Sequence, residues 1–377
     1  MDIFHRFYPA YLDQYSPSPV QAKVAHNIMN CKTGAYGANV CVCEDCGFVQ
    51  IHYNSCRNRC CPMCQAVPKE MWMDARREDV LDAPYFHLVF TVPDILNPVI
   101  YSNQRLLYDA LYHAASSTIS ELTADPKHLG AKVGYICILH TWGSEMNFHP
   151  HIHTILLGGG LASNNQWKDN GENFFLPIRV ISKMFRGKYL EELKRLWEED
   201  KLVFHGTAEK FRNHYTFKEL LDSCYGMDWI PHCKKTFNGA QTVIKYLGKY
   251  THRIAVSNHR IVRMDDDTVT FLVKDYRNEG QWKELTISGV EFVRRFLMHV
   301  PPRRFVRIRH YGLLCSRTKS QKLTLCRNLL GCKKYLSKLR DMEMPEILEH
   351  LYGIKVCVCK ACGGHLGKPQ MRMPLRC

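Results

Sequence analysis

The order of apolar and polar residues predicts both helices and strands in the middle of the chain. Apolar positions recur every three or four residues over 104–122 and 183–200, which predicts two amphipathic helices. The strand-like runs are Tyr85–Val92, Val133–Thr141, His151–Leu157 and Thr268–Lys274. The short connection between Thr141 and His149 predicts antiparallel pairing, and the polar stretch Asn164–Asn173 predicts a loop. The pattern therefore indicates an α+β fold.

Positive charge is concentrated in one segment of the chain. The 377 residues include 51 Lys+Arg and 36 Asp+Glu, which gives a formal net charge of +15. Fourteen of the basic residues, and no Asp or Glu, lie between Arg294 and Arg340, where aromatic residues such as Phe305 and Tyr311 interrupt them. This pattern favours contact with nucleic acid; the alternative for any basic run is an ordinary solvated face.

Composition and the N-terminal residues exclude several classes of protein. No apolar run reaches the ~18–20 residues that span a bilayer, and the first eight residues lack the basic and apolar regions of a signal peptide. We therefore expect a cytoplasmic protein with no membrane partner, in which thiols stay reduced. Its 18 cysteines are then metal ligands or core residues rather than disulfides. At roughly 100–200 residues per domain, the length suggests two or three domains.

Eight cysteines fall between Cys31 and Cys64, and they contain two close pairs. Cys43-x2-Cys46 and Cys61-x2-Cys64 are separated by fourteen residues. Two such pairs present four sulfurs to one ion, so the spacing predicts a structural zinc site. The remaining candidates of this region are Cys31, Cys41, Cys56, Cys60 and His52. They hold a second zinc ion, or the cysteines among them are buried thiols without a metal.

The C-terminal end has one clear cysteine pair, Cys359-x2-Cys362. The spacing does not identify its partners. The candidates are Cys357, His365 and Cys377 nearby, and Cys326 and Cys332 further away. A further zinc site at this end is one interpretation, and unligated thiols are the other.

Three histidines alternate along one predicted strand. In Phe148-His-Pro-His-Ile-His153, the side chains of His149, His151 and His153 share one face. Positions 149 and 153 are ~13 Å apart at ~3.3 Å per residue, so a regular strand does not offer all three to one ion. Two imidazoles and a donor from another element form an easier site. Such an open metal site can activate a phosphodiester.

Two tyrosines four residues apart follow downstream. On a helix, Tyr246 and Tyr250 project from one side, and their spacing alone favours core packing. Lys245 and Lys249 form an adjacent cationic stripe that suits phosphates, and Gly248 in a helix interior indicates a close approach by another element. Beside a metal site, a tyrosine can act as the nucleophile on a phosphodiester.

These motifs, in this order, resemble the rolling-circle transposases of the insertion sequence 91 family, which are HUH (His–hydrophobic–His) endonucleases. The resemblance rests on the histidine run, on Tyr246-Leu-Gly-Lys-Tyr250 and on Ser55-Cys-Arg-Asn-Arg-Cys-Cys-Pro-Met-Cys-Gln65. It continues through Phe86–Pro93, Leu139–Gly143, Gly158–Gly160, Lys274–Arg277 and Arg307–Gly312, and so covers most of the chain.

The resemblance implies a fold and a reaction. The core would be a small antiparallel sheet with the HUH pair His151 and His153 on a central strand and the tyrosines on a nearby helix. The partners would be single-stranded DNA at the transposon ends and target DNA. With Mg²⁺ or Mn²⁺, Tyr246 or Tyr250 would form a 5′-phosphotyrosine and leave a free 3′-OH. The motif does not specify the third metal donor; Gln241 is the first candidate, and His149, Glu145 and His87 follow.

The resemblance also divides the chain into three parts. We expect a zinc-binding domain over 1–79, an HUH catalytic domain over 80–293 and a basic DNA-binding region with a further zinc site over 294–377. The candidate zinc ligands are Cys43, Cys46, Cys61, Cys64, Cys31, Cys56 and Cys60, with Cys359 and Cys362 at the C-terminal end. The candidate DNA-binding residues are Lys245, Lys249, Arg253, Arg303, Arg304, Arg307 and Arg309.

Two other functions account for some of these features. A plasmid replication initiator or a conjugative relaxase of the HUH type would use the same chemistry. A non-enzymatic, zinc-containing DNA-binding regulator would explain the charge and the cysteines but gives no role to the histidine strand. We expect a prokaryotic protein that acts at the nucleoid; the sequence leaves its oligomeric state open.

Overall fold

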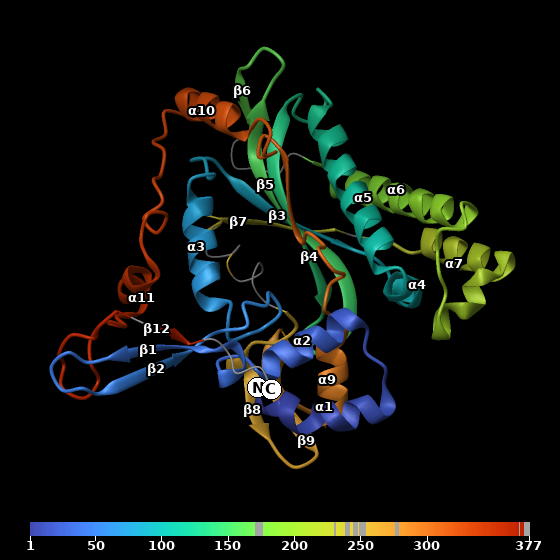
Figure 1. Ribbon diagram of the computed structural model, residues 1–377. Coiled ribbons are helices and arrows are strands. Elements are labelled where there is room, and N and C mark those ends of the chain that lie inside the picture. Colours follow the sequence, from blue (N-terminus) through green and yellow to red (C-terminus); the bar gives the residue numbers. More distant parts are fainter. Residues whose placement is uncertain are drawn as a thin grey trace.

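The centre of the molecule is an antiparallel sheet, seen in the computed structural model (Figure 1). The structure describes residues 1–169, 176–229, 231–237, 242–243, 248, 254–275, 279–368 and 370–372. The strand order is β11-β4-β5-β3-β7, and β6 pairs with β5. The strands are β3 (Tyr85–Thr91), β4 (Lys132–Trp142), β5 (Phe148–Leu161), β6 (Trp167–Asp169), β7 (His232–Phe237) and β11 (Ile308–Gly312).

This sheet confirms the α+β fold with a central histidine strand. The predicted strands at 85–92, 133–141 and 151–157 correspond to β3, β4 and β5, and β4 and β5 are antiparallel as expected. The predicted loop over 164–173 contains the short strand β6, and residues 170–173 lie outside the described residues.

Helices cover one face of the sheet (Figure 1). They are α4 (Asn97–Ser102), α5 (Gln104–Ala124), α6 (Ile178–Glu198) and α7 (His214–Gly226), and α5 and α6 confirm the two predicted helices. The apolar stripe of α5, including Leu111 and Tyr112, packs against Leu139 of β4 and Ile152 of β5 in the largest hydrophobic cluster. Because side chains alternate in a strand, the neighbours of these residues point to the opposite face.

The opposite face of the sheet packs against α3 (Ala66–Arg77) and α10 (Lys319–Leu330). Met73 of α3, Ile155 of β5 and Leu323 of α10 belong to one buried cluster, which also contains Val243. Thr242, Val243 and Gly248 have helical backbone. This second face is the one that carries the histidines of β5.

A second, three-stranded sheet lies with the N-terminal helices. It has the order β10-β9-β8 and is covered by α9 (Gly289–Met298), α1 (Asp2–Gln14) and α2 (Pro19–Met29). Its strands are β8 (Ile261–Met264), β9 (Thr268–Asp275), which corresponds to the predicted strand 268–274, and β10 (Gln281–Ser288). Phe4 of α1 packs edge-on against Phe296 of α9 at 5.3 Å between ring centroids. The N-terminal helices therefore share a core with residues 254–300, across the expected boundaries at 79 and 293.

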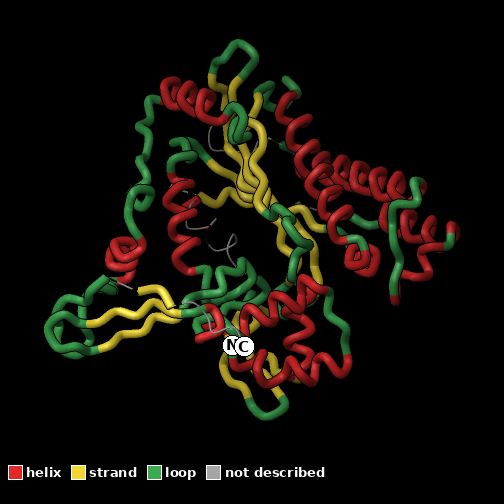
Figure 2. Tube along the Cα trace, in the orientation of Figure 1, coloured by secondary structure: helices red, strands yellow, loops and turns green. Residues whose placement is uncertain are grey.

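A third sheet joins the two ends of the chain. β1 (Ala38–Val42) pairs with β2 (Val49–Tyr53) on one side and with β12 (Gln370–Arg372) on the other. Figure 2 shows this sheet as a projection at the edge of the molecule. Four short 3-10 helices complete the described elements: η1 (Gly34–Tyr36), η2 (Asp94–Leu96), η3 (Gly206–Arg212) and η4 (Asn258–Arg260).

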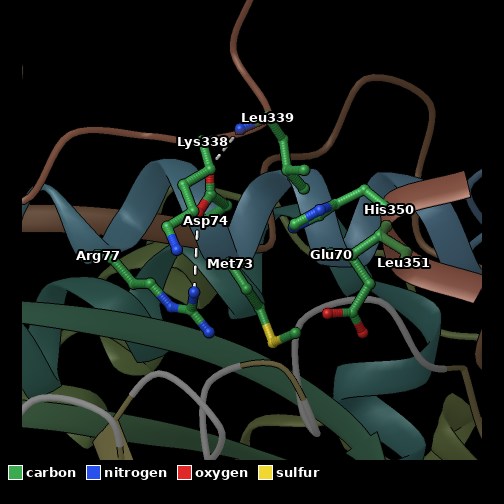
Figure 3. A pocket seen from close by; sticks show the side chains of 8 residues that line it. All are labelled: Glu70, Met73, Asp74, Arg77, Lys338, Leu339, His350 and Leu351. Atoms are coloured by element: carbon green, nitrogen blue, oxygen red, sulfur yellow. Dashed lines mark hydrogen bonds and ion pairs between the residues drawn. The ribbon is translucent and has the colours of Figure 1, made fainter. Parts of the chain in front are cut away.

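The chain reaches this third sheet through a segment that crosses α3. We call residues 331–343, between α10 and α11 (Met344–Tyr352), the C-terminal strap (Figures 1 and 2). Figure 3 shows Lys338 and Leu339 of the strap beside Asp74 of α3. Among the helices formed by the described residues, none has the length and apolar character needed to cross a membrane.

Candidate functional site

Three histidines meet on the α3 face of the central sheet. His140 comes from β4, and His151 and His153 come from β5; their ligating nitrogens all lie within 4.8 Å of one another. His140 is directly opposite His151 in the pairing of the two strands. The Nε2 atoms of His151 and His153 are 3.0 Å apart. Neighbouring strands therefore supply the imidazoles that one strand alone could not bring to a common point.

The environment of His151 and His153 keeps these two histidines neutral. His151 and His153 are 9% and 8% exposed. Burial, together with the neighbouring imidazole of His149, lowers the pKa of His151 to about 3. Burial and the nearby His140 and His151 hold the pKa of His153 well below its ordinary value. Neutral imidazole is the form that binds metal ions, because its second nitrogen carries a free electron pair.

Hydrogen bonds orient two of the rings. Nδ1 of His151 donates to the carbonyl oxygen of His149 over 2.7 Å, which leaves Nε2 as the nitrogen that faces His153. His87 of β3 places its Nε2 2.9 Å from Nδ1 of His153, and the two rings stack with centroids 5.1 Å apart. Each ring of the β5 pair is thus held through Nδ1, with Nε2 directed at the other.

The donor set fits a divalent cation. Two metal–nitrogen bonds of about 2.1 Å at a right angle place the nitrogens about 3 Å apart. The distance of 3.0 Å between the Nε2 atoms of His151 and His153 matches this arrangement, and His140 supplies a third nitrogen from the adjacent strand. Three ligands from the protein leave coordination positions for water or a substrate oxygen.

The sequence prediction identified two of the three histidines. His149 does not join the group: its side chain turns toward Asp94, with Nδ1 3.2 Å from the carboxylate, because it lies nearer the exposed end of β5. Gln241 lies outside the described residues. The sequence prediction did not include His140 among the candidate ligands. The signal was a lone histidine in a predicted strand just before the histidine strand, where a short connection places it opposite.

Both candidate tyrosines, Tyr246 and Tyr250, lie outside the described residues. Gly248 between them is described and buried, and a Cβ there would overlap Sδ of Met73 and lie 3.3 Å from Cε of Lys69. The expected close approach at Gly248 is therefore confirmed, and the approaching element is α3. Val243, three residues before the first tyrosine, is buried in the cluster on the histidine face of the sheet.

One cluster of four cysteines forms beside the N-terminal helices. Cys31, Cys56, Cys61 and Cys64 have sulfurs within 4.8 Å of one another. Sγ of Cys64 is 3.2 Å from Sγ of Cys31 and 3.5 Å from Sγ of Cys56. A tetrahedral ion with zinc–sulfur bonds of about 2.3 Å separates its sulfurs by about 3.8 Å. The set fits a structural zinc ion.

A second cluster corrects the predicted pairing of the cysteines. Cys43 and Cys46 do not meet Cys61 and Cys64; their sulfurs group with those of Cys359 and Cys362 from the far end of the chain. The β1–β2 hairpin carries the first pair away from the second, so fourteen intervening residues do not bring the two pairs together.

Cys60 belongs to neither cluster among the described residues. It is 4% exposed, and burial raises the pKa of its thiol while Arg307 and Arg59 lower it. Its neighbour Cys61 supplies the ligand of the first cluster instead. The prediction of Cys60 as a zinc ligand is therefore wrong in this structure.

The basic segment is only partly available to a partner. Arg309 forms an ion pair with Asp109 and its guanidinium lies 4.0 Å from the ring centre of Tyr112. Burial lowers the pKa of Arg307, which is half-buried. Both side chains are partly buried, and their predicted contact with phosphate stays a prediction. Arg303 and Arg304 are exposed.

Other charges of the same segment are paired with acidic residues. Arg340 pairs with Glu78 at 2.6 Å and Lys319 pairs with Asp79 at 2.8 Å. Arg294 and Arg295 both pair with Glu291, at 2.6 and 2.7 Å. The remaining candidates Lys245, Lys249 and Arg253 lie outside the described residues.

Comparisons with known proteins agree with these features. A family described as "Putative transposase" matches residues 134–322, and one described as "Transposase zinc-binding domain" matches residues 3–92. The chain is 40% identical to "Putative transposase y4qJ" of Sinorhizobium fredii over 365 residues, which cover 96% of this chain and 92% of that protein. It is 30% identical to "Transposase for insertion sequence element IS801" of Pseudomonas savastanoi pv. phaseolicola, over 81% of this chain and 72% of that protein.

Among solved structures, a metal-free conjugative relaxase TrwC in complex with oriT DNA matches 46% of this chain and 68% of its own. The sequence identity is 15% and the TM-score is 0.24, and a value this low does not establish a common arrangement of the whole fold.

The fold and the site thus belong to a DNA transposase with a zinc-binding module. The chain is a member of the insertion sequence 91 family of transposases, on the strength of its two family matches and of its identity to y4qJ over nearly its full length. This assignment makes DNA its partner and sets aside the plasmid initiator or relaxase and the non-enzymatic regulator.

Proposed function

We propose that this transposase cleaves and rejoins single-stranded DNA at the ends of its insertion sequence through a 5′-phosphotyrosine intermediate. The observation that carries the proposal is the group formed by His140, His151 and His153 on one face of the central sheet. Val243 and Gly248, on either side of Tyr246, pack against elements on that same face. The candidate nucleophiles Tyr246 and Tyr250 belong to this segment of the chain.

The three histidines would hold Mg²⁺ or Mn²⁺ through neutral imidazole nitrogens. When bound, the cation supplies positive charge that polarises the scissile phosphate and stabilises its transition state. His87 holds the ring of His153 in place through Nδ1, and the carbonyl of His149 does the same for His151. Such supporting bonds fix ring orientation and raise the basicity of the ligand nitrogen.

Tyrosine carries out the bond exchange. The phenolic oxygen of Tyr246 or Tyr250 attacks phosphorus, loses its proton and forms the phosphotyrosine; the bond to the 3′-oxygen breaks, and that oxygen takes up a proton as a 3′-OH. The bond energy is conserved in the phosphotyrosine. A 3′-OH from another strand can then attack the same phosphorus and release the tyrosine, so cleavage and rejoining need no external energy source.

We assign the first cysteine cluster, Cys31, Cys56, Cys61 and Cys64, as the zinc site of the N-terminal module. Its four sulfurs have tetrahedral spacing, and all four residues lie within the segment that matches the zinc-binding domain. Cys61 and Cys64 directly precede α3, so a zinc ion here would fix the start of the helix that approaches Gly248.

The nucleophile is tested by trapping the covalent product. Purified protein is incubated with a single-stranded oligonucleotide of the element end and Mn²⁺, and the DNA-linked peptide is mapped by mass spectrometry. We expect an adduct on Tyr246 or Tyr250 and its loss in the double variant Tyr246→Phe, Tyr250→Phe. Tyr215→Phe, an exposed tyrosine on α7, is the matched control and should form the adduct normally. An adduct in the double variant refutes the assignment.

The metal site is tested with a matched pair of variants on one strand. His151→Ala should abolish cleavage and Mn²⁺ binding, because its nitrogen belongs to the three-histidine group. His149→Ala should retain both, because its side chain contacts Asp94 instead. Normal cleavage by His151→Ala at low Mn²⁺ concentration would place the metal elsewhere, and an equal loss in both variants would indicate a general effect on β5.

A further inference from the structure

We propose that Cys43, Cys46, Cys359 and Cys362 bind a zinc ion that joins the two ends of the chain into one zinc ribbon. The family match for the zinc-binding domain ends at residue 92, so it does not include the second cysteine pair. The site is assembled only by the folded chain, because its two halves are more than 300 residues apart. It stands on its own geometry and does not depend on the cleavage mechanism proposed above.

The four sulfurs have the spacing of a tetrahedral thiolate site. Sγ of Cys43 is 3.6 Å from Sγ of Cys362, and Sγ of Cys46 is 3.7 Å from Sγ of Cys359. These distances agree with the roughly 3.8 Å expected between sulfurs that share one zinc ion. All four sulfurs lie within 4.8 Å of one another.

The two loops that carry the sulfurs have the same sequence pattern and the same hydrogen bonds. Each reads Cys-Val-Cys-x-x-Cys-Gly, starting at Cys41 in one loop and at Cys357 in the other. In each, the amide of the first ligand donates to a carbonyl five residues on, and the glycine amide donates back to that ligand. The bonds are Cys43 N to Phe48 O (2.9 Å), Gly47 N to Cys43 O (3.0 Å), Cys359 N to Gly364 O (2.8 Å) and Gly363 N to Cys359 O (3.0 Å).

Both loops turn at a glycine with left-handed backbone. Gly47 has φ 70° and Gly363 has φ 78°, a conformation that side chains with Cβ rarely adopt. In the C-terminal loop, amides also point at the sulfurs: Ala361 N lies 3.4 Å from Sγ of Cys359, and Gly364 N lies 3.4 Å from Sγ of Cys362. Amide donors directed at sulfur stabilise the thiolate, which is the form that binds metal.

Main-chain bonds join the two loops beside the sulfurs. Glu44 N donates to His365 O over 3.1 Å, and Gly367 N donates to Val42 O over 2.9 Å. Cys43 and Leu366 form an antiparallel bridge, and β12 extends the same sheet by pairing with β1. The C-terminal segment therefore completes a structure that β1 and β2 begin.

The ribbon has too little apolar core to hold itself together. Among the described residues, its buried cluster consists of Cys41, Cys43, Cys359 and Leu366. The apolar residues on the opposite face are about half exposed: Val42 48%, Val49 52%, Ile51 50% and Tyr53 52%. A module of this kind obtains its folding free energy from a bound metal. Three of the four residues in that small core are cysteines, which places the metal where a hydrophobic core would otherwise be.

Metal content tests the site directly. The full-length wild-type protein, reconstituted with Co²⁺ under reducing conditions, should show thiolate-to-cobalt absorption from two four-cysteine sites. Cys359→Ser with Cys362→Ser should lose half of that absorption. The matched control Cys357→Ser, an exposed cysteine outside both clusters, should lose none. Unchanged absorption in the double variant would overturn the proposal.

A second experiment keeps the test valid if that variant misfolds. A protease site is inserted after Gly353, in the exposed connection between α11 and the C-terminal loop. After cleavage, we expect the fragment that begins at Ile354 to co-elute with the remainder in gel filtration, and to separate when a zinc chelator is added with a reductant. Separation without chelator, or persistent association with chelator and reductant, would overturn the proposal; the reductant excludes a disulfide as the link.

Discussion

The contact between Asp74 and the C-terminal strap is the sharpest test of how the basic segment is held. Asp74 of α3 is 4% exposed and accepts three hydrogen bonds from the strap. Oδ1 accepts from the hydroxyl of Tyr335 at 2.6 Å, and Oδ2 accepts from the hydroxyl of Ser337 at 2.6 Å. Oδ2 also accepts from the amide of Leu339 at 3.0 Å (Figure 3). Nη1 of Arg77 lies 3.7 Å from Oδ1 of Asp74.

The substitution Asp74→Asn keeps the size of the side chain and removes its charge. A hydrogen bond to a charged group is worth about 1.5–3 kcal/mol and a neutral one about 0.5–1.5 kcal/mol, so each of the three bonds should weaken by about 1 kcal/mol. The sum, about 3 kcal/mol, corresponds to about a 100-fold increase in the opening of the strap. The amide group can keep its oxygen toward Ser337 and Leu339, while Tyr335 turns its hydroxyl to accept.

Hydrogen exchange of the Leu339 amide measures this local opening. We expect its protection to fall about 100-fold in Asp74→Asn, while amides of β4 and β5 keep theirs. Asp82→Asn, an exposed aspartate shortly after α3, is the matched control and should change nothing. If the protection of Leu339 stays within about twofold of wild type, the strap does not depend on this carboxylate and the reasoning is refuted.

The same contact predicts a dependence on pH. Burial acts to raise the pKa of Asp74, but the hydrogen bonds from Ser337, Tyr335 and Leu339 outweigh it and leave the pKa below its ordinary value. A lowered folded-state pKa adds stability above the unfolded pKa of about 3.9, and this stability is lost as the pH falls through the folded value. Protection of Leu339, corrected for intrinsic exchange, should therefore decrease below about pH 4 in the wild type. The decrease should be smaller in Asp74→Asn, where Glu78, which accepts from the amide of Ser337 and pairs with Arg340, is the carboxylate that still titrates against the strap.

Two further predictions concern the approach of α3 and the free basic charge. Gly248→Ala should reduce DNA cleavage and destabilise the protein by about 1–3 kcal/mol, because the added methyl group overpacks against Met73. Adding Met73→Ala should recover part of the cleavage. No recovery in the double variant would mean that the overlap with Met73 is not the cause. Replacing Arg303 and Arg304 by Ala should flatten the slope of log affinity against log salt by about 1.4, at about 0.7 per phosphate contact on a single strand. Arg340→Ala, whose charge is paired with Glu78, should leave the slope nearly unchanged, and equal slopes in all variants would refute a DNA contact at the exposed arginines.

Much of the fold follows from local patterns in the sequence. The strands β3, β4 and β5 of the central sheet and the helices α5 and α6 were predicted because alternation and helical spacing depend on residues close together in the chain. The short connection between β4 and β5 also made their antiparallel pairing predictable. The packing of α1 and α2 against residues 254–300 was not predictable in this way, because an apolar helix face does not specify its partner.

The candidate site was also predictable only where it depends on residues close together in the chain. Alternation placed His151 and His153 on one face of a strand, and the structure agrees. The third member, His140, depends on the register of two strands, and a single-residue change in register would have turned it to the other face. The close approach at Gly248 was predicted from the cost of glycine in a helix. The residue that approaches it, Met73, could not be predicted, because it belongs to α3, which is distant in the sequence.

By itself, the sequence determined which residues are candidates for metal or DNA binding, because alternating histidines, paired cysteines and a basic run can be recognised from their spacing. Tertiary structure decided which of them act together. It joined Cys43 and Cys46 to Cys359 and Cys362 instead of to the nearer pair, and it used charges of the basic run to anchor the strap on α3. The physical reason is that spacing fixes geometry only within one element, whereas a four-ligand site or an ion pair depends on how distant elements pack.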